Sequence, residues 1–268
     1  MSGIDFAVIG GTGLYQLAQL RQITPHPVDT PYGAPSDAIL AGRLDGRDGD
    51  GQVLFLARHG AGHTLPPHRV NYRANLWALR QLGARRIIAI NAVGGITAAM
   101  APRRLVLPDD LIDYTWGRAH TFHDGPGAGG GGGAGAGPGN GDSGDAPVEH
   151  VDLSQPYDPG LRQALLTAAA AAGSELVDGG VYGATQGPRL ETPAEIRRMA
   201  RDGCDVVGMT GMPEAVLARE LGLAYASIAV VANWAAGCGD QAEITLAEVL
   251  DNVAAASAHL PALLRHLV

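Results

Sequence analysis

Residues 86–95 read Arg-Ile-Ile-Ala-Ile-Asn-Ala-Val-Gly-Gly, an apolar β-branched segment that runs directly into polar and glycine-rich residues. Three further apolar segments end in the same way, at Gly10-Gly11-Thr12-Gly13, at Arg58-His59-Gly60 and at Asn233. Short apolar runs of this kind are typical of buried strands. In α/β proteins, ligands bind beyond the carboxyl ends of such strands. We therefore expect these four strand ends to meet at one ligand site.

Segments with a helical pattern lie between and after these strands. Residues 70–82 carry leucines at helical spacing, and residues 161–172 form an alanine-rich helix. Further helices are expected over residues 193–200, 213–221 and 246–267. Strands that alternate with helices predict a single α/β domain over residues 1–268, with a central mixed, largely parallel β-sheet flanked by helices.

The composition argues against several classes of protein. The formal net charge of −8 disfavours broad nucleic-acid binding, because phosphate backbones require a basic face. No apolar run approaches the ~20 residues of a membrane helix, and residues 1–5 lack the basic start of a signal peptide. Cys204 and Cys238 have no metal-ligand spacing and predict reduced thiols. We expect a cytoplasmic protein with no membrane or nucleic-acid partner.

Residues 125–144 differ in kind from the rest of the chain. Glycine fills twelve of these twenty positions. Such a segment cannot bury enough apolar surface to offset the entropy of ordering it. We expect a flexible insertion that interrupts the domain without dividing it.

Two motifs indicate an anion site, and each has an alternative interpretation. The backbone amides after Gly10 and the hydroxyl of Thr12 could cradle a phosphate, although a glycine turn between strand and helix has the same composition. Arg58 offers a rigid fork of donors and His59 one more, although surface Arg-His pairs are common. His63 follows His59 at a spacing seen in metal sites, but no third ligand follows at a convincing spacing.

Seven short blocks, taken in order along the chain, carry a family resemblance. They are Gly10-Gly11-Thr12-Gly13, Thr30-Pro31-Tyr32-Gly33-Ala34-Pro35-Ser36, Ala57-Arg58-His59-Gly60, Pro67-His68-Arg69-Val70-Asn71-Tyr72-Arg73-Ala74-Asn75, Asn91-Ala92-Val93-Gly94-Gly95, Thr185-Gln186-Gly187-Pro188-Arg189-Leu190-Glu191-Thr192 and Gly208-Met209-Thr210-Gly211-Met212-Pro213-Glu214. Apart from residues 125–144, nearly the whole chain resembles the trimeric purine nucleoside phosphorylase and methylthioadenosine phosphorylase family.

The resemblance implies phosphorolysis of a purine nucleoside by a homotrimer, with inorganic phosphate as co-substrate and no metal or organic cofactor. It implies a phosphate site made by Thr12, Arg58, His59, the backbone of Ala92, and Thr210. Met209, and less directly Tyr72, occupy ribose positions. Leu190 occupies the position where the family places an aromatic ring against the base, so an aliphatic wall is expected here.

Glu191 and Asn233 indicate which base is bound, and we expect them to be the catalytic pair. The 6-oxopurine branch of the family has Glu and Asn at these positions, whereas methylthioadenosine-specific relatives have Asp in place of the Asn and a second Asp where this chain has Ala235. A 6-oxopurine presents N1–H to a carboxylate and O6 to an amide donor, which fits this pair. Two structural interpretations stay open: a carboxylate at a helix N-terminus for Glu191, and a strand cap for Asn233.

The last helical segment indicates what fills the 5′ end of the nucleoside. In methylthio-specific relatives the corresponding helix lays aliphatic residues against the methylthio group, and here it carries Leu246, Val249 and Leu250. Ordinary nucleosides need a polar partner for the 5′-hydroxyl, and residues 243–258 contain no histidine. The same leucines also suit the core face of an amphipathic helix. His150 resembles a residue that a neighbouring subunit lends to this pocket.

The combination of a 6-oxopurine site and an apolar tail pocket implies 5′-methylthioinosine as the substrate. The alternatives are a methylthioadenosine phosphorylase, a general 6-oxopurine nucleoside phosphorylase and, from another class, a nucleoside-binding protein without catalytic activity. Trp234 departs from the family pattern, which has a smaller residue or proline there, and a bulky ring would change the shape of the base pocket.

Overall fold

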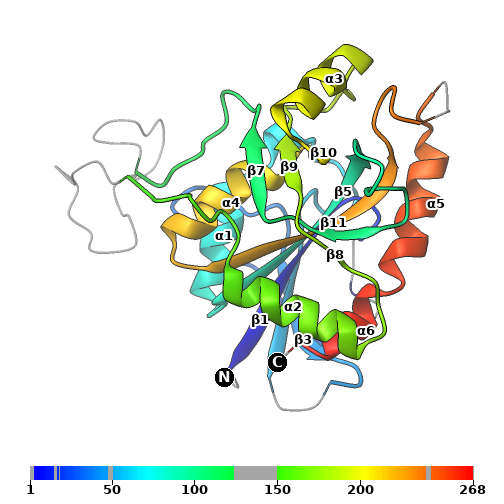
Figure 1. The fold of residues 1–268 in the computed structure, drawn as a ribbon. Helices are drawn as coiled ribbons and strands as arrows, with labels where there is room; N and C mark the ends of the chain where they lie inside the picture. The colour runs from blue at the N-terminus through cyan, green and yellow to red at the C-terminus, as the bar shows by residue number, and fades with distance from the viewer. Residues whose placement is uncertain are drawn as a thin grey trace.

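The computed structural model describes residues 3–14, 17, 19–47, 51–123, 150–239 and 243–267. A mixed, largely parallel β-sheet forms the centre of one α/β domain, and helices cover it (Figure 1). The fold class expected from the alternation of strands and helices is confirmed. The glycine-rich residues 125–144 lie outside the described residues, so their flexibility stays a prediction.

The described strands and helices follow one another in a regular order. The strands are β1 (Ile4–Gly10), β2 (Leu20–His26), β3 (Ile39–Leu44), β4 (Gln52–Ala57), β5 (Arg86–Gly95), β6 (Leu105–Leu107), β7 (Asp110–Asp113), β8 (Val177–Asp178), β9 (Val181–Ala184), β10 (Val206–Gly208) and β11 (Ala224–Trp234). The helices are η1 (Pro67–Arg69), α1 (Tyr72–Gln81), α2 (Pro159–Ala171), α3 (Pro193–Asp202), α4 (Gly211–Glu220), α5 (Leu246–Ser257) and α6 (Leu260–Arg265).

Strands β1 and β4 bring the first two motifs together. They pair in parallel, and the last residue of β1, Gly10, lies opposite the last residue of β4, Ala57. The segments that follow therefore leave the sheet side by side. Thr12 and His59, which are 47 positions apart in the numbering, are brought to the same edge by this register.

Strand β5 divides the sheet at the point where the third motif lies. It pairs with β1 only through residues 87–89, and further along it pairs with the antiparallel strand β10 at Gly94 and Gly95. On its other side it pairs with β11 along its whole length. The pairing of β5 with β1 ends at Ala89, and its pairing with β10 begins at Gly94. Asn91 and Ala92 lie between these two pairings.

Two apolar clusters lie on opposite faces of the sheet. Helices α1 and α4 contribute to one cluster, and α2, α5 and α6 contribute to the other. Aliphatic side chains dominate both clusters. The sheet edge that carries the motifs is thereby held between two packed layers.

Several elements differ from those expected. β5 and β11 each continue through their polar residues, to Gly95 and Trp234, instead of ending before them. The single terminal helix expected over residues 246–267 is two helices, because Pro261 in the first turn of α6 has no N–H to continue α5. No described helix has the length and apolar character needed to cross a membrane.

Candidate active site

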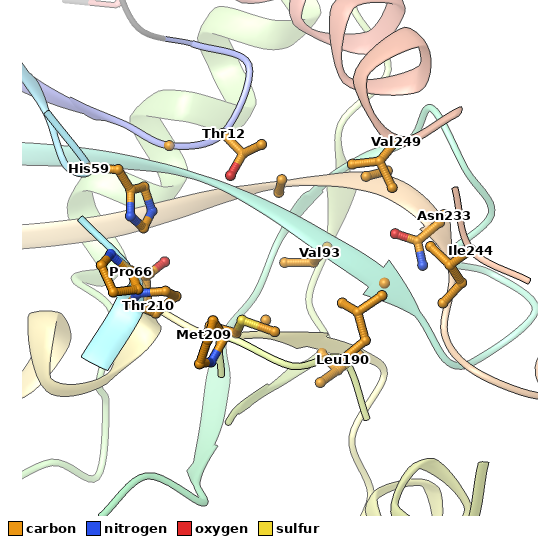
Figure 2. Close-up of a pocket in the computed structure, with 18 of the residues that line it drawn as sticks. Thr12, His59, Pro66, Val93, Leu190, Met209, Thr210, Asn233, Ile244 and Val249 are labelled. Atoms are coloured by element: carbon orange, nitrogen blue, oxygen red, sulfur yellow. The ribbon is translucent and has the colours of Figure 1, made fainter. Parts of the chain in front are cut away.

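A cavity of about 460 Å³ lies beyond the carboxyl ends of β1 and β4 and against the last residues of β5 and β11 (Figure 2). Eleven of the fourteen residues proposed from the sequence line it: Thr12, Arg58, His59, Ala92, Leu190, Glu191, Met209, Thr210, Asn233, Leu246 and Val249. In Figure 2, Thr12, His59 and Thr210 lie toward one end of the cavity, and Asn233 lies at the other. Residues from the four strand ends singled out in the sequence therefore line one cavity.

Three residues proposed for the site lie elsewhere. Tyr72 is buried behind the cavity, where its hydroxyl donates to the carbonyl of Pro67 at 2.9 Å. Leu250 is partly exposed on α5 and does not line the cavity. His150 is exposed and also lies outside the cavity wall of its own chain. Its proposed role concerns a neighbouring subunit and stays a prediction.

The glycines of the first motif allow a close approach of two segments. A Cβ atom on Gly11 would lie 2.6 Å from the carbonyl oxygen of Ile90 and 3.0 Å from Nη1 of Arg58. Only glycine fits there. The turn interpretation of this motif and its position at the site are therefore compatible, since the missing side chain is what lets Thr12 reach the cavity beside Arg58.

Arg58 lines the cavity and forms an ion pair with a buried carboxylate. Its Nε and Nη2 donate to the two oxygens of Glu214 at 2.7 and 2.8 Å, and both side chains are fully buried. Nη1 donates to the carbonyl of Ile90 at 2.9 Å, and Tyr225 donates to Glu214 at 3.0 Å. Burial lowers the pKa of Arg58, but Glu214 more than offsets this and keeps the guanidinium charged. Glu214 lies inside a block quoted from the sequence, yet no role was assigned to it.

His59 presents an acceptor to the cavity in its neutral form. Its Nδ1 lies 2.7 Å from the carbonyl oxygen of Leu65, which can only accept, so Nδ1 carries the proton. Burial, followed by the charge of Arg58, lowers the pKa of His59 to about 4. Near neutral pH the remaining nitrogen, Nε2, is therefore a bare lone pair. Among the described residues, no group of three or more potential ligands is placed to hold a metal ion.

A buried relay behind Thr210 fixes the direction of its hydroxyl. The amide of Asn91 donates to Oγ1 of Thr210 at 2.7 Å, and the hydroxyl of Ser227 donates to Oδ1 of Asn91 at 2.8 Å. Because Thr210 accepts at its oxygen from this relay, its own hydroxyl proton is left to point elsewhere. All three side chains are buried. Neither Asn91 nor Ser227 lines the cavity; Asn91 lies inside a block quoted from the sequence, yet it was given no role there, and Ser227 lies in none of the blocks.

The geometry bears on the two open interpretations of Glu191 and Asn233. The N-cap of α3 is Thr192, and the reciprocal carboxylate of its capping box is Glu195, so Glu191 does not cap the helix. Oε1 of Glu191 accepts from the hydroxyl of Thr185 at 2.6 Å, and burial raises the pKa of Glu191. Asn233 lies within β11, next to a register shift between residues 231 and 233, and does not terminate the strand.

Asn233 retains most of its hydrogen-bonding capacity. Within the described residues its amide nitrogen donates once, to the carbonyl of Trp234 at 2.7 Å, which leaves one N–H and the carbonyl oxygen available. The pairing of β11 with β5 is irregular between residues 231 and 233, and irregularities such as β-bulges commonly redirect a side chain beside a site. The ring of Trp234 lies close to Gly239 and does not line the cavity, so it does not fill the end of the cavity that carries Asn233.

The start of α5 closes the remaining side of the cavity with aliphatic side chains. Ile244, Leu246 and Val249 line it. Ile244 was not proposed from the sequence, although its apolar side chain precedes the helix by only two residues. Asn252, further along α5, donates to the carbonyl of Ala232 at 2.7 Å and accepts from Nε of Arg103 at 2.7 Å. These contacts tie the helix to the strand that carries Asn233.

A family model described as "Phosphorylase superfamily" matches residues 5–268. The chain belongs to the phosphorylase superfamily. Its relatives include a protein of Xanthomonas campestris pv. campestris named "Probable S-methyl-5'-thioinosine phosphorylase", 59% identical over 99% of this chain and 98% of that protein. They also include a "6-oxopurine nucleoside phosphorylase" of Pyrococcus furiosus, 43% identical over 91% of this chain and 84% of that protein.

Solved structures of the phosphorylase superfamily share the fold as well. A methylthioadenosine phosphorylase from Schistosoma mansoni in complex with adenine has a TM-score of 0.86 and 31% identity, and covers 98% of this chain and 90% of its own. The resemblance to nucleoside phosphorylases inferred from the seven sequence blocks is confirmed, and with it the assignment of the chain as a phosphorylase-type enzyme.

Proposed function

We propose that this enzyme cleaves 5′-methylthioinosine with inorganic phosphate and releases hypoxanthine and 5-methylthioribose 1-phosphate. The observation that carries the proposal is the pairing of Glu191 and Asn233 with an aliphatic wall at the start of α5 in a single cavity. Glu191 and Asn233 select the 6-oxopurine base, and the aliphatic wall selects the 5′-methylthio group. The 59%-identical relative from Xanthomonas campestris, named "Probable S-methyl-5'-thioinosine phosphorylase", supports the same substrate.

The donor and acceptor pattern at the base end matches a 6-oxopurine. A carboxylate at Glu191 accepts from N1–H of hypoxanthine, and the available N–H of Asn233 donates to O6. Adenine would present a bare N1 to that carboxylate. Sites that pair a polar edge in this way reject the mismatched analogue strongly, because a buried group is left unpaired. Leu190 covers the base with an aliphatic side chain.

The reaction needs charge stabilisation at both ends of the breaking bond. When C1′–N9 breaks, its electron pair goes to the purine, and a phosphate oxygen forms the new bond to C1′. The leaving base takes up a proton from water at N7, and hydrogen phosphate gives up its proton to water as the new bond to C1′ forms. The carbonyl oxygen of Asn233 accepts a hydrogen bond from the N7–H. Thr12, His59 and Thr210 surround the phosphate at the other end, where its negative charge stabilises the cationic ribose.

The tail pocket distinguishes a methylthio group from a hydroxyl. Ile244, Leu246 and Val249 offer no hydrogen-bonding side chain, so a 5′-hydroxyl would lose water without gaining a partner. A methylthio group has no hydroxyl whose hydrogen bonds to water are lost there, and it buries apolar surface. Leu246 is 69% exposed in the single chain, so the pocket gains its full effect only when something covers it.

A homotrimer in the cytoplasm supplies that cover in our proposal. Trp116, Leu190 and Leu246 are 73%, 51% and 69% exposed, and Leu190 and Leu246 line the cavity. Exposed apolar side chains of this size are typical of association surfaces. His150 of a neighbouring subunit would then lie near the tail. Light scattering of the purified protein tests the trimer, and a monomer at assay concentration would contradict it.

The decisive experiment is an assay with four nucleosides, with and without phosphate. Methylthioinosine, methylthioadenosine, inosine and adenosine are incubated with the enzyme, and the free base is quantified. We expect phosphate-dependent hypoxanthine release, mainly from methylthioinosine. Preferential adenine release would favour a methylthioadenosine phosphorylase, as in the Schistosoma structure, and equal use of inosine would favour a general 6-oxopurine phosphorylase, as in the Pyrococcus relative. Phosphate-independent binding with no release would indicate a binding protein.

A further inference from the structure

Arg118 is a buried arginine that the phosphorylase motifs leave without a role. It lies in the segment after β7, and only 9% of it is exposed. Its nitrogens donate to six oxygens. Nε donates to Oε1 of Gln186 at 3.2 Å, and Nη2 donates to the carbonyls of Thr185 at 3.1 Å and Gln186 at 2.9 Å. Nη1 donates to the carbonyls of Met209 at 2.8 Å and Met212 at 2.6 Å and to the hydroxyl of Tyr72 at 3.3 Å.

The carbonyl oxygens of Thr185 and Gln186 belong to one wall of the active site, and those of Met209 and Met212 belong to another. Thr185 and Gln186 begin the segment that leads to Leu190 and Glu191, which contact the base in the proposed function. The carbonyls of Met209 and Met212 bracket Thr210 on the segment for ribose and phosphate. One planar guanidinium therefore spans the gap between the base wall and the sugar-phosphate wall.

Only arginine meets the geometric demand of this position. Its five N–H groups diverge in one plane, and every one of them has an acceptor here. Lysine has three donors on one nitrogen and could not reach both walls at once. The guanidinium carbon also lies 5.6 Å from the centroid of the Tyr72 ring, which fixes the plane of the fork.

The acceptors of Arg118 are all neutral, which sets it apart from Arg58. Arg58 is neutralised by the carboxylate of Glu214, whereas Arg118 has its N–H groups committed to carbonyls, an amide and a hydroxyl. Within the described residues no carboxylate forms an ion pair with it. Because the charge lies behind the segment that carries Thr210, it is placed to act on an anion in the cavity with little screening by solvent.

We propose that Arg118 is a positioning residue that holds the base and sugar-phosphate walls in register and contributes positive charge toward bound phosphate. The inference rests on the proposed function for the identity of the two walls. It requires no contact between Arg118 and the substrate. Loss of the fork would misplace Glu191 relative to Thr210, and loss of the charge would weaken phosphate binding.

Two variants separate the fork from the charge. Arg118→Lys keeps the charge and loses the fork, so we expect kcat to fall about tenfold or more while the dissociation constant of phosphate changes by less than about threefold. Arg118→Met loses both, so we expect the affinity for phosphate to fall about tenfold beyond that of Arg118→Lys. Calorimetry measures phosphate binding without nucleoside, so a wrong substrate assignment leaves this measurement intact.

The matched control is Arg162→Lys. Arg162 also donates to two backbone carbonyls, those of Leu107 and Pro108, but it lies on α2 away from the cavity. We expect its kinetics to equal those of the wild type even if its melting temperature falls. A kcat in Arg118→Lys equal to that of wild type would overturn the positioning role, and equal phosphate affinity in Arg118→Met and Arg118→Lys would overturn the charge. If Arg118→Met does not fold, Arg118→Gln replaces it in the binding measurement.

Discussion

Arg58 and Glu214 meet in a two-pronged ion pair, with N–O distances of 2.7 and 2.8 Å, in which neither side chain is exposed to solvent. The two residues are 156 positions apart, one after β4 and the other on α4. The ion pair links the segment that follows β4 to α4, the helix that begins directly after Thr210. It also means that the most conspicuous cation of the cavity brings little net charge to it.

Removing the carboxylate of this ion pair should lower the free energy of unfolding and increase the net positive charge of the site. In Glu214→Gln, Arg58 loses its counter-ion but keeps its position, so we expect the free energy of unfolding to fall by about 3–5 kcal/mol. The folded fraction should bind phosphate more tightly than wild type, because the charge of Arg58 is no longer balanced. Urea denaturation with and without phosphate measures both effects.

Glu220→Gln is the control for this prediction. Glu220 accepts from the hydroxyl of Thr121 and the amide of Phe122 at 2.7 Å, and no arginine contacts it in the described part of the chain. Its substitution should cost about 1–2 kcal/mol and leave phosphate affinity unchanged. Weaker phosphate binding in Glu214→Gln would show that geometry, not charge, is what Arg58 contributes.

Base preference should follow position 233. Asn233→Asp removes the N–H that meets O6 and places an acceptor there, so the variant should favour a 6-amino group. We expect the ratio of kcat/KM for methylthioadenosine over methylthioinosine to rise at least about tenfold, as measured by base release. Asn71→Asp, which alters the N-cap residue of α1, should leave the ratio as in wild type. An unchanged ratio in Asn233→Asp would sink the assignment of the base end.

The neutral state of His59 predicts an acid limit of stability. Above pH 6.5 His59 is uncharged in both the folded and the unfolded chain and contributes nothing. Between pH 6.5 and about 4 the unfolded chain binds a proton that buried His59 does not, so stability falls as the pH falls, by on the order of 3 kcal/mol in total. His59→Gln should lose this contribution and show a flatter profile of melting temperature over that range. A profile as steep as that of wild type would show that His59 titrates normally.

The bare Nε2 of His59 also predicts discrimination between anions. Hydrogen phosphate carries a proton that it can donate to Nε2, whereas sulfate in the neutral range has none and would face a lone pair. Sulfate should therefore bind weakly at pH 7.5 and more tightly as the pH falls toward 4, because the protonated fraction of His59 increases toward its pKa of about 4. Competition of sulfate against phosphate measures this. In His59→Gln the dependence on pH should disappear, because an amide can turn its N–H toward the anion.

The tail pocket can be tested with one isosteric change. Val249→Thr keeps the shape of the side chain and adds a hydroxyl to the cavity wall. We expect the preference for methylthioinosine over inosine, expressed as the ratio of kcat/KM values, to fall about tenfold. Leu250→Thr, on the same helix but outside the cavity, should not change it. If both variants shift the preference equally, the effect comes from the helix and not from the wall.

The sequence predicted the parts of the site that end apolar strands and missed the parts that depend on tertiary contacts. Thr12, Arg58 and Asn233 follow or end hydrophobic runs, so periodicity and residue type placed them at one edge. Arg118 lies in a segment with no periodic pattern, and its acceptors are backbone carbonyls that no residue type reveals. Glu214 required knowledge of a partner 156 residues away.

The short strands were missed for a related reason. β10 contains only Val206–Gly208, and it is held in place by contacts with distant elements: a Cβ on Gly208 would lie 2.1 Å from the hydroxyl of Tyr182. Three residues give no periodic signal. The antiparallel edge strand β2 is exposed along most of its length, so it gives no apolar pattern, and neither it nor the adjacent β3 was expected from the sequence.

The hydrogen bond from Asn252 to the carbonyl of Ala232 has a consequence for how specificity can change in evolution. In the proposed function, the choice of 5′ substituent resides in the last part of the chain, whereas phosphate recognition resides in its first half and in the segment around Thr210. A C-terminal segment that keeps this asparagine would dock on the same strand whatever its remaining side chains. A single recombination event after β11 could therefore exchange one sugar preference for another and leave the reaction chemistry unchanged.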